Sequence, residues 1–242
     1  MGNAAFFDLD NTLIKGSALF HLGVGMVDHR LVTRREIARH ARRHLAYRWR
    51  GEHAPDVTSM RDNALAMGTG LRVDAVVALS EQVYDARIAG RLWEGTCRLA
   101  RGHLDSDDGV WIVTAAPVEL AEIVARRLRF SGALGTVAEV RDGAWTGRLV
   151  GEVLHGQVKA DAVRTLADRQ GLRLETCAAY SDSFNDLPLL DAVGFPHVVN
   201  PDRRLGRIAR ERGWPVHDFR STRRALRMVQ PRARTAAVTL SA

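Results

Sequence analysis

Short apolar runs alternate with longer amphipathic segments along most of the chain. The first run, NAAFFDLD, is apolar at consecutive positions before it ends in acidic residues, which is typical of a strand buried on both faces. Three later runs have the same character, VWIVT at 110–114, CAAYSD at 177–182 and HVVN at 197–200. Segments with helical spacing separate them. This alternation predicts an α/β fold with an open, mainly parallel sheet flanked by helices.

The segment between the first two predicted strands is too long and too helical for a simple crossover. Helical patterns cover 17–50, 58–67, 73–89 and 92–104. We therefore predict a helical cap at 17–104, inserted into a core formed by 1–16 and 105–220. The basic remainder, 221–242, is predicted to be a tail with partial disorder.

The second half of the chain contains clear helix and turn signals. Pro117 is expected to open a helix, because proline suits the first turn. A helix from Lys159 should end at Gly171, which suits a left-handed cap. Asp142-Gly143 predicts the turn of a hairpin within VAEVRDGAWTGRLVG, and another helix should run from Pro201 to about Arg212.

Composition and charge limit the partners and the cellular location that we expect for this protein. The net charge of +7 permits nucleic acid, an anionic membrane surface or phosphorylated ligands as partners, but no basic motif interleaved with aromatic residues is present. We therefore expect no nucleic-acid partner. Cys97 and Cys177 lack metal-ligand spacing and predict a reducing, cytoplasmic location. No apolar stretch near the N-terminus is long enough to span a bilayer, and we expect no signal peptide.

Acidic residues follow the first predicted strand. Asp8 and Asp10 share one side of an extended chain because side chains alternate with a period of two. Burying such charges without a partner is costly. Taken alone, the pair is better explained by solvated acids at a turn, but its context weakens that interpretation, because Asn11 and Thr12 can fold back to close a tight turn.

Two further positions could bind an anion. Thr114 ends the second predicted strand just before a helix, where a hydroxyl and free backbone N–H groups make an anion site. A simple helix cap is the alternative. Lys159 is one of two lysines, the other being Lys15, and it begins a helix where the helix dipole disfavours a cation. We expect it to face a negative group, with a solvated lysine as the alternative.

The segment YSDSFNDLPLL places Asp182 at a predicted strand end and Asp186 four residues later. Carboxylates after a buried strand can hold a hard cation through oxygen ligands. Capping of the helix that contains Pro188 is a second role open to Asp186.

The order of these motifs, DxD, then Thr, then Lys, then DxxxD, resembles the haloacid dehalogenase (HAD) superfamily of phosphohydrolases. TAAPVELA, RDGAWTGRLVG and SDSFNDLPLL are similar to subfamily IB, the branch that includes phosphoserine phosphatase. The resemblance implies a Rossmann-like core with a helical C1-type cap after the first strand. It also implies a Mg²⁺-dependent phosphatase that acts through an aspartyl-phosphate intermediate.

The same resemblance assigns roles to single residues. Asp8 would be the nucleophile and Asp10 the general acid and base, and both are tolerable in a buried site if a metal and a lysine offset them. The phosphoryl group would be bound by Thr114, Ala115, Lys159 and Asn185. The Mg²⁺ ligands would be Asp8, the Asp10 backbone carbonyl and Asp182, with Asp186 orienting them through hydrogen bonds.

The substrate is less defined. Phosphoserine phosphatases carry a glutamate nine residues after the nucleophile to bind the substrate amine, and Ser17 stands here, which argues against phosphoserine as the main substrate. The arginine-rich segment 34–50 is best explained as a solvated face. Recruitment of an anionic substrate, or of a membrane surface carrying a phospholipid-like ester, is the other interpretation. Membrane contact would then be peripheral at most.

Two other functions stay open from the sequence. An alcohol in place of water would make the chain a phosphotransferase. A non-catalytic regulator could use the fold to bind nucleic acid or an acidic partner, but the intact set of motif residues favours an enzyme. The acid at Asp10 favours phosphate-ester hydrolysis over dehalogenation or ATP-driven pumping. The sequence leaves the oligomeric state undetermined.

Overall fold

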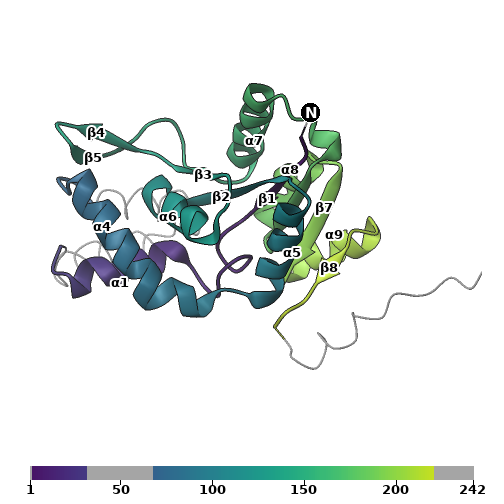
Figure 1. Ribbon diagram of the computed structural model, residues 1–242, viewed down its shortest axis with the longest axis horizontal. Helices are drawn as coiled ribbons and strands as arrows, with labels where there is room; N and C mark the ends of the chain where they lie inside the picture. The colour runs from purple at the N-terminus through teal and green to yellow at the C-terminus, as the bar shows by residue number, and fades with distance from the viewer. Residues whose placement is uncertain (1, 32–67, 221–242) are drawn as a thin grey trace, which may run out of the picture.

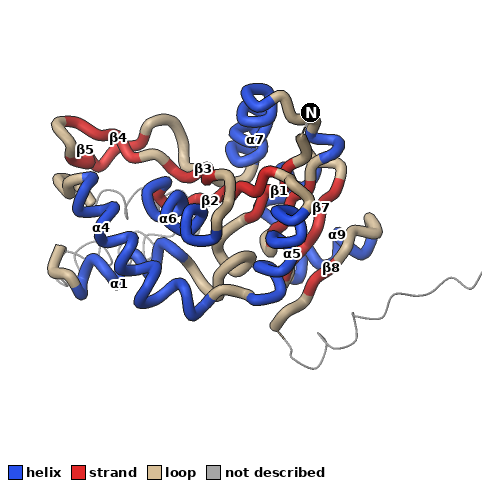
Figure 2. Tube along the Cα trace, in the orientation of Figure 1, coloured by secondary structure: helices blue, strands red, loops and turns tan. Residues whose placement is uncertain are grey.

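A six-stranded, fully parallel sheet forms the centre of the computed structural model, which describes residues 2–31 and 68–220 (Figures 1 and 2). The strand order is β3-β2-β1-β6-β7-β8. All four strands expected from the apolar runs are present, and two short edge strands, β3 and β8, were not predicted. The strands are β1 (Ala4–Phe7), β2 (Gly109–Pro117), β3 (Gly132–Thr136), β6 (Ala178–Ser181), β7 (Phe195–Val199) and β8 (Val216–His217).

Helices cover both faces of this sheet, as the alternating pattern predicts. Phe7 and Tyr180 pack on the face covered by α5 and α6, whereas Phe6 and Ala179 pack on the face covered by α7, α8 and α9. The period of two along β1 therefore sends its odd and even residues into two separate cores. The helices are α5 (Glu94–Asp105), α6 (Val118–Leu128), α7 (Gln157–Gln170), α8 (Leu187–Asp191) and α9 (Arg203–Glu211).

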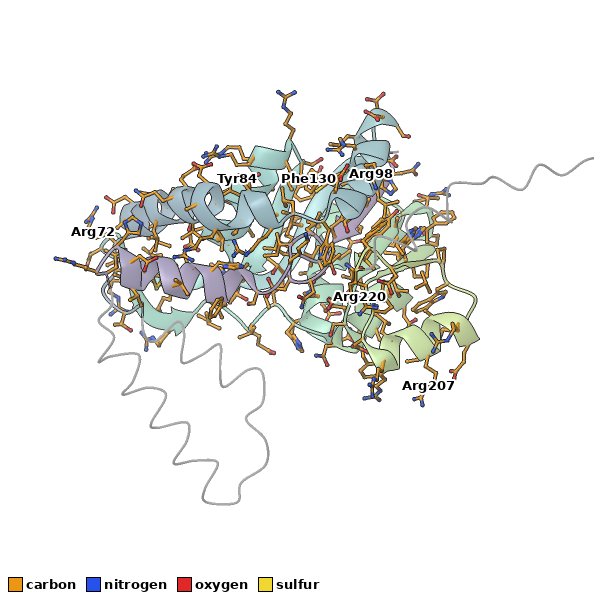
Figure 3. All side chains as sticks on the ribbon, turned by 90° about the horizontal axis from the view of Figure 1, so that it is seen from below. Arg72, Tyr84, Arg98, Phe130, Arg207 and Arg220 are labelled. Atoms are coloured by element: carbon orange, nitrogen blue, oxygen red, sulfur yellow. The ribbon has the colours of Figure 1, made fainter. Side chains whose placement is uncertain are left out.

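A helical unit lies beside the sheet, at the place predicted for the cap. In it α1 (Ala18–Asp28) and α4 (Val73–Val83) run side by side (Figures 1 and 3). Instead of one helix over 73–89, α4 passes into a π-helical turn, Tyr84–Ile88, and a 3₁₀ turn, Ala89–Arg91. The predicted helix 58–67 and the arginine-rich segment 34–50 lie outside the described residues, as does the tail 221–242.

The predicted hairpin is confirmed as β4 (Ala138–Arg141) and β5 (Ala144–Leu149). Asp142 and Gly143 both have positive φ, as its two-residue turn requires. The hairpin reaches beyond the sheet to the helical unit (Figure 2), where Trp145 N donates to the Leu71 carbonyl and Gly70 N donates to the Trp145 carbonyl.

Several boundaries differ from the sequence expectation. The helical pattern over 17–50 does not form one helix, because α1 ends at Asp28 and Arg30 has positive φ, and α7 begins at Gln157 instead of Lys159. Pro117 ends β2 in extended backbone, paired with Thr136, so α6 begins one residue later at Val118. The helix α5 falls within the range predicted for the cap but packs against β1 and β2. The end of α7 is as predicted, with Gly171 in the left-handed conformation. None of the helices in the described ranges is long and apolar enough to cross a membrane.

Gly194 lies in the loop that leads from α8 to β7. Substituting this residue tests how tightly that loop packs against the segment around Glu175. A Cβ at this position would stand 1.8 Å from the carbonyl oxygen of Glu175, a backbone atom that cannot rotate away. Gly194→Ala should therefore lower the free energy of unfolding by about 1–3 kcal/mol, measured by chemical denaturation.

Gly102 in α5 provides the matched control, because a Cβ there meets open space. Gly102→Ala should raise the free energy of unfolding by about 0.5–1 kcal/mol, since alanine loses less conformational entropy in a helix. An unchanged denaturation midpoint for Gly194→Ala would contradict the close contact with Glu175.

Candidate active site

The predicted site residues are placed by the pairing of β1 with β6. Phe7 pairs with Tyr180, and Asp8 N donates to the Tyr180 carbonyl at 2.9 Å. The carboxyl ends of the two strands therefore lie at one edge of the sheet, where Asp8 follows β1 and Asp182 follows β6. This edge is where ligands bind in open α/β sheets.

A buried ammonium group links two of the predicted acids. Lys159 Nζ lies 2.5 Å from Asp8 Oδ1 and 2.8 Å from Asp186 Oδ2. Lys159 is in the first turn of α7, and all three side chains are buried. The expectation that this lysine faces negative groups is met by the contacts, and a solvated lysine is excluded.

Asp186 is held by more than the lysine. Its Oδ2 also accepts a hydrogen bond from Ser181 Oγ at 2.8 Å. Asp186 is the N-cap residue of α8, but its side chain makes no capping hydrogen bond, so its carboxylate serves the cluster instead. Ser181 was missed in the sequence; its signal was the period of two along β6, which directs Ser181 to the same face as Ala179, where α7 packs.

The pKa shifts of Asp8 and Lys159 indicate that the cluster holds more negative than positive charge. Burial raises the pKa of Asp8 well above its usual value; the Lys159 charge opposes this, and neighbouring carboxylates, first Asp186 and then Asp182, add to it. Burial alone would lower the pKa of Lys159, but the charges of Asp186 and Asp8 outweigh it and raise that pKa. The lysine therefore stays protonated and faces more carboxylates than it can neutralise.

Asp182 is the partly exposed member of this group. Burial, followed by the charge of Asp186, raises the pKa of Asp182 to about 7. Its Oδ1 lies 3.5 Å from Thr12 Oγ1, and its backbone carbonyl accepts from Asp202 N at 2.8 Å. Asp202 also caps α9 and accepts from Phe184 N, so one aspartate fixes the loop on which Asp182 and Asp186 lie.

The loop after β1 is folded as predicted, with Asn11 as the closing residue. Asn11 has positive φ, its N–H donates to the Gly16 carbonyl, and its Oδ1 accepts from Gly16 N at 3.1 Å. Thr12 lies within this turn, and its hydroxyl faces Asp182. Asp10 Oδ1 accepts from Ala18 N at 2.8 Å, which ties the loop to the start of α1.

The other predicted ligands of the phosphoryl group lie near strand ends. Thr114 is buried near the end of β2 and its Oγ1 accepts from Ala116 N at 3.1 Å, so it does not cap α6. The carbonyl of Ala115 accepts from Thr136 Oγ1, and Asn185 is exposed in the 3₁₀ turn Phe184–Asp186. Their roles toward a substrate stay predictions.

Comparison with known proteins identifies this arrangement. The family model for haloacid dehalogenase-like hydrolases matches residues 5–191, which include all the residues of the cluster. The chain belongs to this family. The predicted family, the α/β fold class and the enzyme class, a phosphoric monoester hydrolase, are thereby confirmed.

Known proteins resemble this HAD hydrolase at several levels of sequence identity. Phosphoserine phosphatase SerB1 of Mycobacterium tuberculosis is 50% identical over 231 residues, which are 95% of this chain and 75% of that protein. Histidinol-phosphatase of Neisseria meningitidis is 27% identical over 91% of this chain and 100% of its own. A crystal structure of a protein of unknown function from Bordetella pertussis matches with a TM-score of 0.79 and 28% identity, covering 90% of this chain and 100% of that chain.

The donor set at the strand ends fits a hard divalent cation. Asp8 and Asp182 offer carboxylate oxygens, and one ammonium group faces the surplus negative charge. Within the described ranges, no three or more His, Cys, Asp and Glu side chains are grouped to hold a metal. Carboxylate oxygens beside a buried strand end are the ligand type that a hard divalent cation takes, together with waters.

The raised pKa of Asp182 gives a test that needs no substrate. With a folded-state pKa of about 7 and an unfolded value of about 3.9, the folded protein binds more protons in between, so this group costs stability as pH rises through that window. Asp182→Asn removes the cost. We compare the melting temperatures of Asp182→Asn and the wild type in the presence of a metal chelator. The advantage of the variant over the wild type should grow by roughly 2–4 °C from about pH 5 to about pH 8.

Mg²⁺ should favour the wild type over Asp182→Asn, since a bound cation would relieve the repulsion between Asp182 and the neighbouring carboxylates. At about pH 8 it should raise the melting temperature of the wild type more than that of Asp182→Asn. A difference that does not change with pH, or equal shifts with Mg²⁺ in both proteins, would show that Asp182 is not part of a charged metal site.

Proposed function

We propose that this HAD hydrolase is a Mg²⁺-dependent phosphatase that cleaves a phosphomonoester through an aspartyl-phosphate on Asp8. The observation that carries the proposal is the buried Asp8 at a strand end, ion-paired to Lys159, with Asp10 two residues later on the adjoining loop. A buried carboxylate beside a fixed cation is poised to approach an anionic phosphate.

The first half of the reaction transfers the phosphoryl group to the protein. A carboxylate oxygen of Asp8 attacks phosphorus and the bond to the ester oxygen breaks. Asp10 donates a proton to the departing oxygen, so an alcohol leaves. The Lys159 ammonium balances charge on the transferring phosphoryl oxygens.

The second half returns Asp8 to its free form. Asp10, now ionised, accepts a proton from a water that attacks phosphorus, and the bond between phosphorus and the Asp8 oxygen breaks to release phosphate. When bound, Mg²⁺ would be held by Asp8, the Asp10 carbonyl and Asp182, and it would supply positive charge against the phosphoryl oxygens. Asp186 keeps the lysine in place throughout.

The substrate proposed is a small phosphorylated molecule in the cytoplasm. The two named relatives are called phosphatases of different esters, phosphoserine and histidinol phosphate, so the family resemblance alone does not select one. Ser17 stands just before α1 where a glutamate would bind the amine of phosphoserine, and we propose a main substrate other than phosphoserine.

Hydrolysis of p-nitrophenyl phosphate with Mg²⁺ tests the mechanism. Asp8→Asn should lower kcat by about 10³-fold or more, because the nucleophile is lost, and Asp10→Asn by about 10²–10⁴-fold, because proton transfer is lost.

Asp168→Asn is the matched control, since Asp168 is exposed on α7, the same helix as Lys159. It should keep activity within about twofold of the wild type, because surface substitutions of this kind change little. Wild-type turnover in Asp8→Asn would remove Asp8 from the mechanism.

A further inference from the structure

Asn200 is a buried polar residue that the mechanism above does not use. It follows β7 directly and is only 5% exposed. Asp8 and Asp182 follow β1 and β6, and β6 lies between β1 and β7 in the sheet. The three residues therefore stand at the ends of three neighbouring parallel strands, at the edge that carries the candidate site.

The backbone of Asn200 has a conformation that few residues adopt. Its φ is 47°, and the next residue is Pro201. Positive φ is uncommon outside glycine, although asparagine accepts it more readily than most residues. A residue in such a conformation persists only where its surroundings fix it, and such residues gather at functional sites.

The side chain of Asn200 joins two segments that are far apart in the sequence. Its Oδ1 accepts a hydrogen bond from Phe219 N at 2.7 Å, and its Nδ2 donates to the Asn11 carbonyl at 3.4 Å. The contact with Phe219 fixes the orientation of the amide, because a backbone N–H can only donate and requires the side-chain oxygen opposite it. The NH₂ group therefore faces Asn11, which is next to Asp10 on the loop after β1.

The Phe219 end of this link is itself held by its neighbours. Asn200 N donates to the His217 carbonyl at 2.8 Å, which pairs the end of β7 with β8. The Phe219 ring stacks on His217 with centroids 6.1 Å apart, and a Cβ on Gly95 in α5 would stand 2.4 Å from the same ring. The segment after β8 is thus packed against α5, and it sets the position of the Asn200 amide.

The loop that carries Asp10 is held from two sides. Asp10 Oδ1 accepts from Ala18 N at the start of α1, so the carboxylate is tied to the helical unit. The Asn11 carbonyl is tied to the end of β7 through Asn200, which fixes the backbone beside Asp10 relative to the core, where Asp8 lies. A proton donor must lie within hydrogen-bond distance of the leaving oxygen, and a displacement of about 1 Å can cost about 10²-fold in rate.

We infer that Asn200 is a positioning residue, which holds the backbone after Asp10 so that the Asp10 carboxyl group reaches the leaving oxygen. Asn200 acts through Asn11 and not on the substrate itself. The inference rests on the proposed phosphatase function, because it assigns Asn200 to the step in which Asp10 donates a proton. A purely structural role would instead make Asn200 equally important for every ester.

Two esters that differ in their need for a proton test this role. The phenolate of phenyl phosphate is a poor leaving group that depends on protonation, whereas p-nitrophenolate departs with little help. We compare kcat/KM because it reports the steps up to departure of the alcohol, and not the later activation of water. Asn200→Asp loses the amide donor but keeps the acceptor for Phe219 N and the tolerance of positive φ. It should lower kcat/KM for phenyl phosphate by about 10–100-fold and for p-nitrophenyl phosphate by less than about threefold.

A second variant and a matched control separate the lost contact from the added charge. Glycine accepts positive φ and adds no charge, so Asn200→Gly should show the same difference between the two esters. Asn3→Asp adds the same charge at an exposed residue just before β1, at the opposite edge of the sheet. It should keep both values of kcat/KM within about twofold of the wild type.

A double-mutant cycle tests whether the effect passes through Asp10. In an Asp10→Asn background, Asn200→Asp should lower kcat/KM for phenyl phosphate by less than about a further twofold, because the proton donor is already absent. Losses that multiply in the double variant would overturn the inference. Equal losses for the two esters in Asn200→Asp would overturn it as well.

Hydrogen exchange provides a readout that does not depend on turnover. Measured by mass spectrometry, the backbone amides of loop residues 10–16 should exchange about 5–10-fold faster in Asn200→Gly than in the wild type, as expected for the loss of one hydrogen bond. Unchanged exchange would overturn the inference. If the wild type hydrolysed neither ester, the proposed hydrolysis would be refuted and the role of Asn200 in proton donation with it, whereas faster exchange would still show that Asn200 holds the loop.

Discussion

The buried contact of the Lys159 ammonium with Asp8 and Asp186 is the interaction on which the arrangement of this molecule depends. Removing charges from water costs several kcal/mol per ion, and that cost is offset only when geometry and further hydrogen bonds are good. Removing one partner of such a group typically costs about 3–5 kcal/mol, because the others stay buried and uncompensated. The contact is therefore a constraint on the fold as much as a device for catalysis.

Meeting this constraint requires distant parts of the chain to be placed together. The parallel pairing of β1 with β6 brings Asp8 to the edge where the Asp182–Asp186 loop begins. The start of α7 must then lie over that edge for Lys159 to reach both carboxylates. Asp202, beyond β7, fixes the loop from the far side through the backbone of Asp182 and Phe184. The strands β1 and β6 and the segment after β7 thus all contribute to the position of one ammonium group.

The sequence predicted the parts of this arrangement that carry strong local signals. Consecutive apolar residues identified β1, β2, β6 and β7, and Gly171 marked the end of α7. The edge strand β3 was missed because GALGT contains two glycines and no β-branched apolar residue, and β8 is only two residues long. Pairing with neighbouring strands, which is a tertiary effect, decides both.

The candidate site shows the same limit. The order of the motifs indicated Asp8, Asp10, Lys159, Asp182 and Asp186, but not which carboxylates the lysine would contact. Ser181 and Thr12 have no motif of their own, and their contacts follow only from strand ends that meet in space.

The distribution of charge links the catalytic centre to its surroundings. The floor of the site holds three carboxylates against one ammonium, so it repels a phosphate dianion unless further positive charge is present. A divalent cation at the strand ends would supply that charge where the phosphoryl group reacts. Lys15 and Arg91 lie beside the loop that carries Asp10, where the Lys15 N–H donates to the Arg91 carbonyl.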